Sequence, residues 1–228
     1  MIVLVEWGES LNGVSKVVSD GLYDRASDKV CDHLRRMIVS LELAPGALLI
    51  EAQLMEQLGC GRTPLREAFQ RLHTENLVVA LPRRAVSVAD ITVSSLQQIY
   101  EARWSLEPAI CQLAAQRITA EQLAYLEASV NQPRIADETF SVTEWDMAFH
   151  QCIAEACGNR YLITAFEQLR GPAQRLVSLA FDRKPYIPPT IDEHRKILEA
   201  LAARDSRAVA TAMDEHIHNA KDRILRTL

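Results

Sequence analysis

The stretch Gly61-Arg62-Thr63-Pro64-Leu65-Arg66-Glu67-Ala68-Phe69-Gln70-Arg71-Leu72 sets the fold that we expect for the N-terminal part of the chain. Its apolar residues recur at three- and four-residue steps, which predicts an amphipathic helix. Thr63 is a good N-cap and Pro64 suits the first helical position, where its missing N–H costs nothing, so we expect the helix to begin there. The helix should run to about Glu75 and expose Arg66.

Two further helices precede this stretch and two short strands follow it. The apolar period predicts a helix from Ser27 to about Leu41 and a second helix over Glu51–Leu58. The β-like stretches Leu77–Leu81 and Ala85–Ala89 predict a hairpin. Three short helices followed by a hairpin form the pattern of a winged helix-turn-helix, whose recognition helix enters the major groove of DNA.

Basic side chains gather in this part of the chain although the protein is acidic overall. Arg62 and Arg66 lie at the start of the predicted recognition helix, where arginine can bond guanine or phosphate. From charge alone, a solvated surface is the simpler explanation. The DNA-binding interpretation adds the remaining candidates of the helix and of the hairpin tip, which are Thr63, Gln70, Arg71, Arg83 and Arg84.

Length and composition exclude several classes of protein. The 228 residues are 48% hydrophobic and 24% charged with a net charge of −5, which excludes intrinsic disorder. No apolar run approaches the roughly 18–20 residues that span a bilayer, so we expect no membrane partner. Five cysteines without a C-x-x-C pair favour free thiols and a cytoplasmic protein.

From Ile91 onward the sequence is almost entirely helical in pattern. Pro172 should kink or begin one helix, and Pro185, Pro188 and Pro189 form the longest clear linker. We therefore expect a mainly α protein with an N-terminal winged helix-turn-helix and a C-terminal antiparallel bundle of six to seven helices. The predicted helices lie near 92–117, 120–131, 137–157, 159–181, 190–203 and 206–227.

The expected boundary between the two domains falls near Asp90. Residues 1–20 show no sustained period and are interpreted as a loose N-terminal arm. Residues 21–90 would form the DNA-binding domain, and residues 91–228 the helical domain for effector binding and dimerisation.

Four residues of the helical part are candidate metal ligands. Asp146 and His150 are four residues apart on one predicted helix, so their side chains share a face. His194 and His216 each end an Asp-Glu-His tripeptide near the starts of the last two helices. Imidazole and carboxylate together suit a transition metal. Spacing alone also permits the alternative, in which each histidine is an ordinary surface or core residue.

The N-terminal motif resembles the DNA-binding domain of GntR-family transcriptional regulators. The resemblance covers about residues 24–90 and depends on the stretch Pro45–Glu51, on Leu54–Leu58 and on the Arg62-Thr63-Pro64 to Ala68 core. It implies that Arg62, Thr63 and Arg66 contact DNA.

The helical part resembles the effector-binding FCD domain of the FadR subfamily over roughly residues 93–225. The matching motifs are Glu101-Ala102-Arg103-x3-Glu107-Pro108, Asp146-x2-Phe149-His150, Cys157-Gly158-Asn159, Glu193-His194-x2-Ile197-Leu198 and His216-x2-Asn219. The resemblance implies that Asp146, His150, His194 and His216 bind a divalent metal ion, with zinc first and nickel or manganese as alternatives. It further implies that Arg103 meets the acid group of a small carboxylate effector. A salt bridge from Arg103 to Glu101 or Glu107 is the alternative for that residue. Asn219, one turn beyond His216, would face the same cavity.

Two functions from different classes follow. The first is a homodimeric, ligand-responsive repressor that binds a double-stranded operator and responds to a small organic acid. The second is a helical metal-dependent hydrolase or lyase that acts on small organic acids, in which Glu193 or Glu215 would be the general base. A purely structural metal ion is a third possibility.

Overall fold

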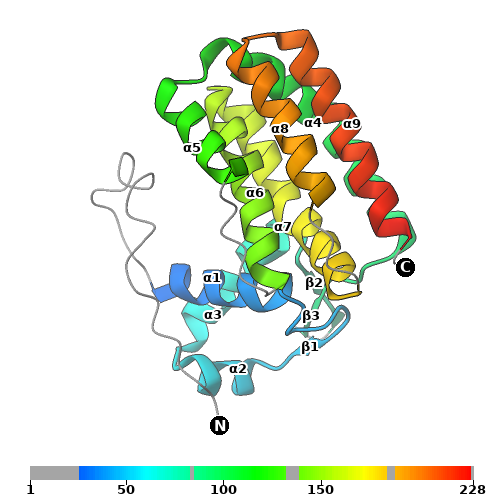
Figure 1. The fold of residues 1–228 in the computed structure, drawn as a ribbon. Helices are drawn as coiled ribbons and strands as arrows, with labels where there is room; N and C mark the ends of the chain where they lie inside the picture. Colours follow the sequence, from blue (N-terminus) through cyan, green and yellow to red (C-terminus); the bar gives the residue numbers. More distant parts are fainter. Residues whose placement is uncertain (1–25, 83–84, 132–138, 184–187, 227–228) are drawn as a thin grey trace.

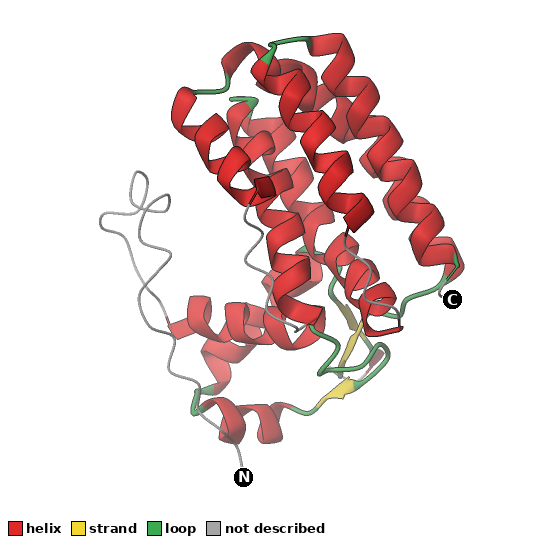
Figure 2. Ribbon diagram, in the orientation of Figure 1, coloured by secondary structure: helices red, strands yellow, loops and turns green. Residues whose placement is uncertain are grey.

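The computed structural model describes residues 26–82, 85–131, 139–183 and 188–226. Within these ranges the chain forms nine helices and three short strands (Figure 2). The helices and strands pack around two separate hydrophobic clusters. We call the part with α1–α3 and the strands the head, and the part with α4–α9 the bundle. Among the described residues, no helix is both long and apolar enough to cross a membrane.

The head consists of three helices and a small antiparallel sheet. The helices are α1 (Ala26–Val39), α2 (Glu51–Leu58) and α3 (Arg62–Thr74). The strands β1 (Leu48–Leu49), β2 (Val78–Ala80) and β3 (Val86–Val88) form a sheet in the order β1-β3-β2. This is the predicted winged helix-turn-helix, with α2 and α3 as the helix pair and β2–β3 as the wing hairpin.

Apolar side chains from all three helices fix the angle between α2 and α3. Leu34 of α1 and Leu65 and Leu72 of α3 are completely buried in the head. Leu54 of α2 is also buried there, and Leu77 joins them from the start of the hairpin. Gly59 ends α2 in the left-handed conformation with a φ of 59°, which glycine adopts without strain. The recognition helix α3 is therefore held by a tight turn and a dry core.

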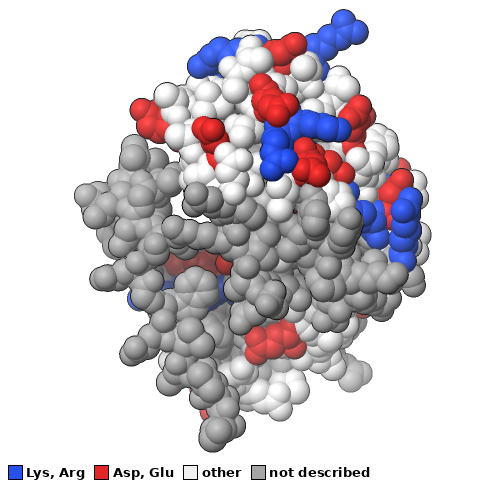
Figure 3. Space-filling model, viewed as in Figure 1, with Lys and Arg blue, Asp and Glu red and all other residues white. Residues whose placement is uncertain are grey.

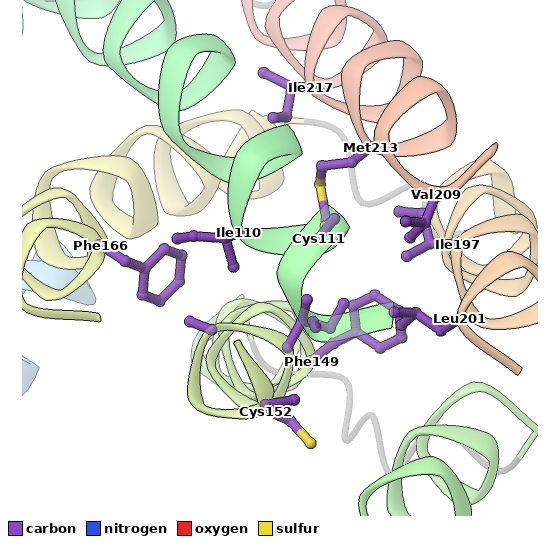
Figure 4. Packing of buried hydrophobic residues seen from close by; sticks show 14 of the residues in the cluster. Ile110, Cys111, Phe149, Cys152, Phe166, Ile197, Leu201, Val209, Met213 and Ile217 are labelled. Atoms are coloured by element: carbon purple, nitrogen blue, oxygen red, sulfur yellow. The ribbon is translucent and has the colours of Figure 1, made fainter. Parts of the chain in front are cut away.

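The bundle consists of α4 (Val93–Arg117), α5 (Ala120–Asn131), α6 (Thr139–Ala156), α7 (Arg160–Arg183), α8 (Pro188–Ala202) and α9 (Ser206–Leu225). Figure 1 shows the last two helices side by side, with α4 beside α9. Figure 4 shows the side chains of Phe149, Ile197, Leu201 and Met213 pointing into a common core. Phe149 of that core stacks on the imidazole ring of His194.

One helix of the bundle reaches the head. The lower end of α7 lies close to the strands in Figure 1, and α7 also contacts α1. Gly171 lies so close to Leu77 that a Cβ atom there would be 3.0 Å from a methyl carbon. Arg175 donates from Nη2 to the carbonyl oxygen of Ala89, 2.6 Å away. The buried face of α7 thus joins the two parts of the molecule.

The structure corrects three expectations. α3 begins at Arg62 with Gly61 as its N-cap, so Thr63 is not the cap and Pro64 is the third helical residue rather than the first. The first-turn N–H groups have no intrahelical partner, so proline fits this position equally well. Strand β1 was not predicted, because two residues are too few to show a period.

The third correction concerns the proposed proline linker. Pro188 and Pro189 open α8 instead of belonging to a linker, since proline fits the first turn of a helix. Pro172 lies inside α7 and does not begin it. Pro185, Arg83, Arg84 and the predicted arm over 1–20 lie outside the described residues.

Candidate functional site

The four predicted metal ligands meet in the middle of the bundle. Asp146 and His150 come from α6, His194 from α8 and His216 from α9. Each offers one ligand atom, and these atoms all lie within 4.8 Å of one another. All four side chains are buried, and His194 is completely inaccessible. The four side chains therefore lie close together, as predicted.

Two of the distances between donor atoms match those around a single metal ion. The Nε2 atoms of His150 and His216 are 3.1 Å apart, and Nε2 of His194 is 3.4 Å from Oδ1 of Asp146. Bonds of about 2.0–2.1 Å to one ion place neighbouring ligand atoms about 2.9–3.4 Å apart in octahedral or tetrahedral geometry. Neither ring nitrogen of His194 has a hydrogen-bond partner, although both are buried. An ion at the centre would satisfy its Nε2 atom.

Two glutamates set the orientation of the imidazole rings. Nδ1 of His150 lies 2.7 Å from Oε2 of Glu107, and Nδ1 of His216 lies 2.8 Å from Oε2 of Glu193. Nδ1 of His216 shares a hydrogen bond with Glu193, and Nδ1 of His150 faces the Glu107 carboxylate. With a hydrogen on each Nδ1, the lone pairs of the two Nε2 atoms face each other. Such a pair is unfavourable without a cation between the atoms. Metal-binding histidines commonly have a carboxylate at the other nitrogen, so the residues fit a metal ion.

The electrostatics favour the protonation states that ligation requires. Burial lowers the pKa of His194 to about 3, and burial also lowers the pKa of His216. Burial alone would raise the pKa of Asp146, but contact with His194 and the neighbouring histidines outweighs it and lowers that pKa. At neutral pH His194 and His216 are therefore neutral and Asp146 is ionised.

Arg103 lies beside this centre in a buried ion pair. Its Nε and Nη2 atoms donate to the two oxygens of Glu107, the same carboxylate that contacts His150. The salt bridge that was the alternative for Arg103 therefore exists in the structure, with Glu107 and not with Glu101. Burial works to raise the pKa of Glu107, but Arg103 and then His150 outweigh it and lower the pKa to about 2.

Tyr100 is a polar residue of this region that sequence reasoning missed. Its side chain is completely buried and its hydroxyl has no hydrogen-bond partner. Burial raises its pKa to about 12, and Arg103 and Asp146 are the next largest influences on it. Tyr100 is three residues before Arg103 and therefore shares its face of the helix. This spacing was the signal in the sequence that could have pointed to Tyr100. Burial of a hydroxyl without a partner costs free energy unless a ligand or a water molecule accepts a hydrogen bond from it.

Asn219 is placed at the edge of this region. It is exposed, and its Nδ2 atom donates to Oε1 of Glu193 at 3.0 Å. Arg223 donates to both oxygens of the same carboxylate. Asn219 thus contacts the residue that orients His216. His218 is also exposed, and its ring stacks on Trp104 with ring centroids 4.0 Å apart.

The candidate DNA-contacting residues described in the structure lie on the outer face of α3. The side chains of Arg62 and Arg66 are 67% and 45% exposed, so both can reach a ligand in solution. Thr63 and Gln70 are also exposed, and Arg71 is exposed but ion-paired with Asp28 of α1. Sequence reasoning missed Glu51, which contacts both Arg62 and Arg66. On the bundle face drawn in Figure 3, basic and acidic side chains are interspersed.

This fold and these sites define a class of protein. A winged helix-turn-helix with exposed arginines on its recognition helix is a DNA-binding module, and here it is joined to a helical bundle with a buried polar site. Together they describe a transcriptional regulator.

Comparison with known proteins gives the family. The chain belongs to the GntR family of bacterial regulatory proteins, whose signature matches residues 26–88, and it carries an FCD domain over residues 98–219. This combination is that of the FadR-like subfamily. The members are transcriptional regulators, so the hydrolase or lyase hypothesis is wrong.

Curated relatives agree with this assignment. The chain is 29% identical over 194 residues to the HTH-type transcriptional repressor RspR of Escherichia coli K12, covering 84% of this chain and 85% of that protein. It is 27% identical over 201 residues to the repressor GlaR of the same organism, covering 81% and 89%. The solved structure of E. coli McbR/YncC has the same fold with a TM-score of 0.80 at 24% identity, covering 90% of this chain and 99% of that one.

Proposed function

We propose that this transcriptional regulator is a repressor whose operator binding is controlled by a small carboxylate bound beside a metal ion in the bundle. The observation that carries the proposal is the convergence of Asp146, His150, His194 and His216 on one buried point. Residues 21–90 would be the DNA-binding domain, and residues 91–228 the effector-binding and dimerisation domain. Two named repressors among the relatives support the sign of the regulation.

The metal ion would be held by the carboxylate of Asp146 and by the Nε2 atoms of His150, His194 and His216. Zinc suits this donor set best, and nickel or manganese are alternatives. When bound, the ion would supply a positive charge and open coordination positions for an anionic oxygen. Glu107 and Glu193 would hold the imidazoles of His150 and His216 in place.

The effector would be recognised by the residues of α4 next to the metal. Arg103 is a buried cation and Tyr100 a buried donor without a partner, which together suit the oxygens of an acid. Glu107 occupies one edge of the guanidinium, so the effector would use the remaining N–H groups. Asn219 would contribute at the edge of the site or through Glu193.

The head would bind the operator through α3 and the wing. Arg62, Thr63 and Arg66 would contact base edges or phosphates, and Arg71, Arg83 and Arg84 would add contacts to the backbone. A homodimer would place two heads on half-sites about one helical turn apart. For an acid to release DNA, it must favour the arrangement of heads that does not fit the operator.

A binding experiment in two steps tests the proposal. The operator is first selected from a pool of randomised DNA duplexes with the full-length protein. Sugar acids, hydroxy acids and dicarboxylates are then screened by thermal shift, with and without a chelator, and each positive compound is added to the operator complex. We expect an acid that stabilises only the metal-loaded protein and weakens operator binding. An acid that binds the chelated protein equally well would contradict the metal-bridged site.

A structural metal ion is the second candidate for the site, favoured by the burial of all four side chains. It predicts that chelation lowers thermal stability without changing the affinity for the acid. The same screen therefore separates the two roles.

A further inference from the structure

Glu51 joins the two helices of the helix-turn-helix at the residues proposed to read DNA. It is the first residue of α2, and its Oε1 atom accepts from Nε of Arg66 at 2.8 Å. Its Oε2 atom accepts from Nη2 of Arg66 at 3.2 Å, and Nε of Arg62 lies 3.5 Å from the same oxygen. One carboxylate thus contacts both arginines across the turn.

The contact uses only one edge of the Arg66 guanidinium. Glu51 takes the edge formed by Nε and Nη2, which leaves Nη1 and the second N–H of Nη2 outside the contact. This remaining edge presents two parallel donors, and the Arg66 side chain is 45% exposed. Guanine offers two acceptors in the major groove, O6 and N7, whereas adenine offers one acceptor and one donor. A guanidinium fixed in this way therefore matches guanine and not adenine.

A restrained arginine differs from a flexible one in what it can bind. A flexible side chain can turn to a phosphate, which carries no sequence information. The bidentate contact with Glu51 opposes that rotation and reduces the entropy lost when a base is bound. The negative charge of Glu51 also weakens attraction to any phosphate nearby, and such attraction provides most of the non-specific affinity.

We propose that Glu51 is a positioning residue for base recognition, which holds Arg66 for a guanine contact and lowers binding to non-specific DNA. The inference depends on the proposed reading of DNA by α3. It predicts that loss of Glu51 reduces discrimination between sequences without reducing the affinity for DNA in general.

The test compares Glu51→Gln with the parent in the full-length protein. The probes are the duplex selected by the parent, the same duplex with each base pair replaced in turn, and a scrambled duplex. At one G·C pair, the ratio of affinities for the selected and the substituted duplex should fall at least about fivefold in Glu51→Gln. The scrambled duplex should bind as tightly as before or tighter. Glu56→Gln removes the same charge from an exposed residue of the same helix and should leave the discrimination at that pair unchanged.

Arg66→Ala identifies the pair in question. It should lose discrimination at the same G·C pair, and Glu51→Gln should have no further effect there when Arg66 is absent. If Glu51→Gln and the parent show the same base preference at every position, the role of Glu51 is overturned, while the proposed reading of DNA by α3 is not affected. Failure of the parent to select any sequence would instead overturn the proposed DNA reading. Equal thermal unfolding of the variants and the parent confirms that folding is intact.

Discussion

Glu107 contacts Arg103 and His150 at the same time, so one buried carboxylate connects the proposed acid-binding residue with a proposed metal ligand. Its pKa is lowered to about 2 because the contacts with Arg103 and His150 outweigh the effect of burial. Replacing Glu107 would leave Arg103 as a buried charge without its partner, which is strongly destabilising in general. The residue is therefore a poor target for separating function from folding, and Tyr100 is a better one.

Tyr100→Phe should weaken effector binding without harming the fold. The hydroxyl has no partner in the structure, so its removal leaves no protein group unpaired and should leave stability equal or slightly higher. Loss of one hydrogen bond to the ionised carboxylate should raise the dissociation constant of the acid about ten- to a hundredfold. Calorimetric titration of the metal-loaded variant with an acid found in the screen measures the change. An unchanged dissociation constant would remove Tyr100 from the effector site.

The protein without metal should lose stability on acidification. The pKa of His194 is about 3 in the folded state against 6.5 for an ordinary histidine, so the unfolded state binds more protons between these values. Stability should therefore fall as the pH falls from about 6.5 toward 3, by up to about 1.4 kcal/mol per pH unit for this histidine. His216 has a pKa shifted in the same direction. Glu107 and Glu193, each with a pKa of about 2 against 4.5, add to the loss at more acidic pH.

Urea unfolding of the chelated protein between pH 8 and pH 5 measures this dependence. The slope should become smaller in His194→Gln, since one titrating group is removed. Stability that stays constant over this range would contradict the buried, neutral state of the histidines.

At the scale of elements, α7 provides the connection between head and bundle. Arg175 is buried, and burial lowers its pKa to about 10, yet its Nη2 atom still donates to the carbonyl oxygen of Ala89. Gly171 allows the close approach of α7 to Leu77. A shift of α7 would therefore move the base of the hairpin and with it the recognition helix.

Arg175→Met should weaken the communication between the two parts while the fold is kept. Methionine fills similar space and removes the buried charge, which offsets the cost of leaving the Ala89 carbonyl unpaired, so stability should change by about 1 kcal/mol or less. The ratio of operator affinities with and without the acid should move toward unity. Fluorescence anisotropy with a labelled operator measures that ratio. A ratio equal to that of the parent would show that this contact does not carry the coupling.

Periodicity predicted where the helices lie, but it did not predict the start of α3 or the short strand β1. The bounds of α2 and the start of α5 agree with the approximate bounds that the local sequence predicted. The start of α3 and the two-residue strand β1 were not predicted, since the first depends on cap geometry and the second on pairing with β3. Resemblance to a family brought the four candidate metal ligands together, which spacing alone left open.

The carboxylates that orient these sites could not be predicted. Glu51, Glu107 and Glu193 are ordinary acidic residues in the sequence, and their importance arises from partners on other turns or helices. Glu193 directly precedes His194 on α8, so the two side chains point about 100° apart around the helix. Glu193 therefore reaches His216 on α9.

At the scale of the whole molecule, the head and the bundle are proposed to communicate through metal occupancy. Chelation should lower the thermal unfolding temperature, because the ion binds only the folded arrangement of α6, α8 and α9. It should also abolish binding of the acid, and adding back zinc should restore both. His150→Ala should show neither response to zinc. An acid that still releases the operator from the chelated protein would contradict the proposed mechanism.

The metal content of the purified protein tests the central claim most directly. Elemental analysis after incubation with zinc and extensive dialysis should give about one ion per chain for the parent, given one site with four protein ligands. Asp146→Asn and His194→Ala should each retain much less, whereas His218→Ala, which alters an exposed histidine of α9, should match the parent. If the parent retains no ion, or if the Asp146 and His194 variants retain as much as the parent, the buried centre of the bundle does not bind metal.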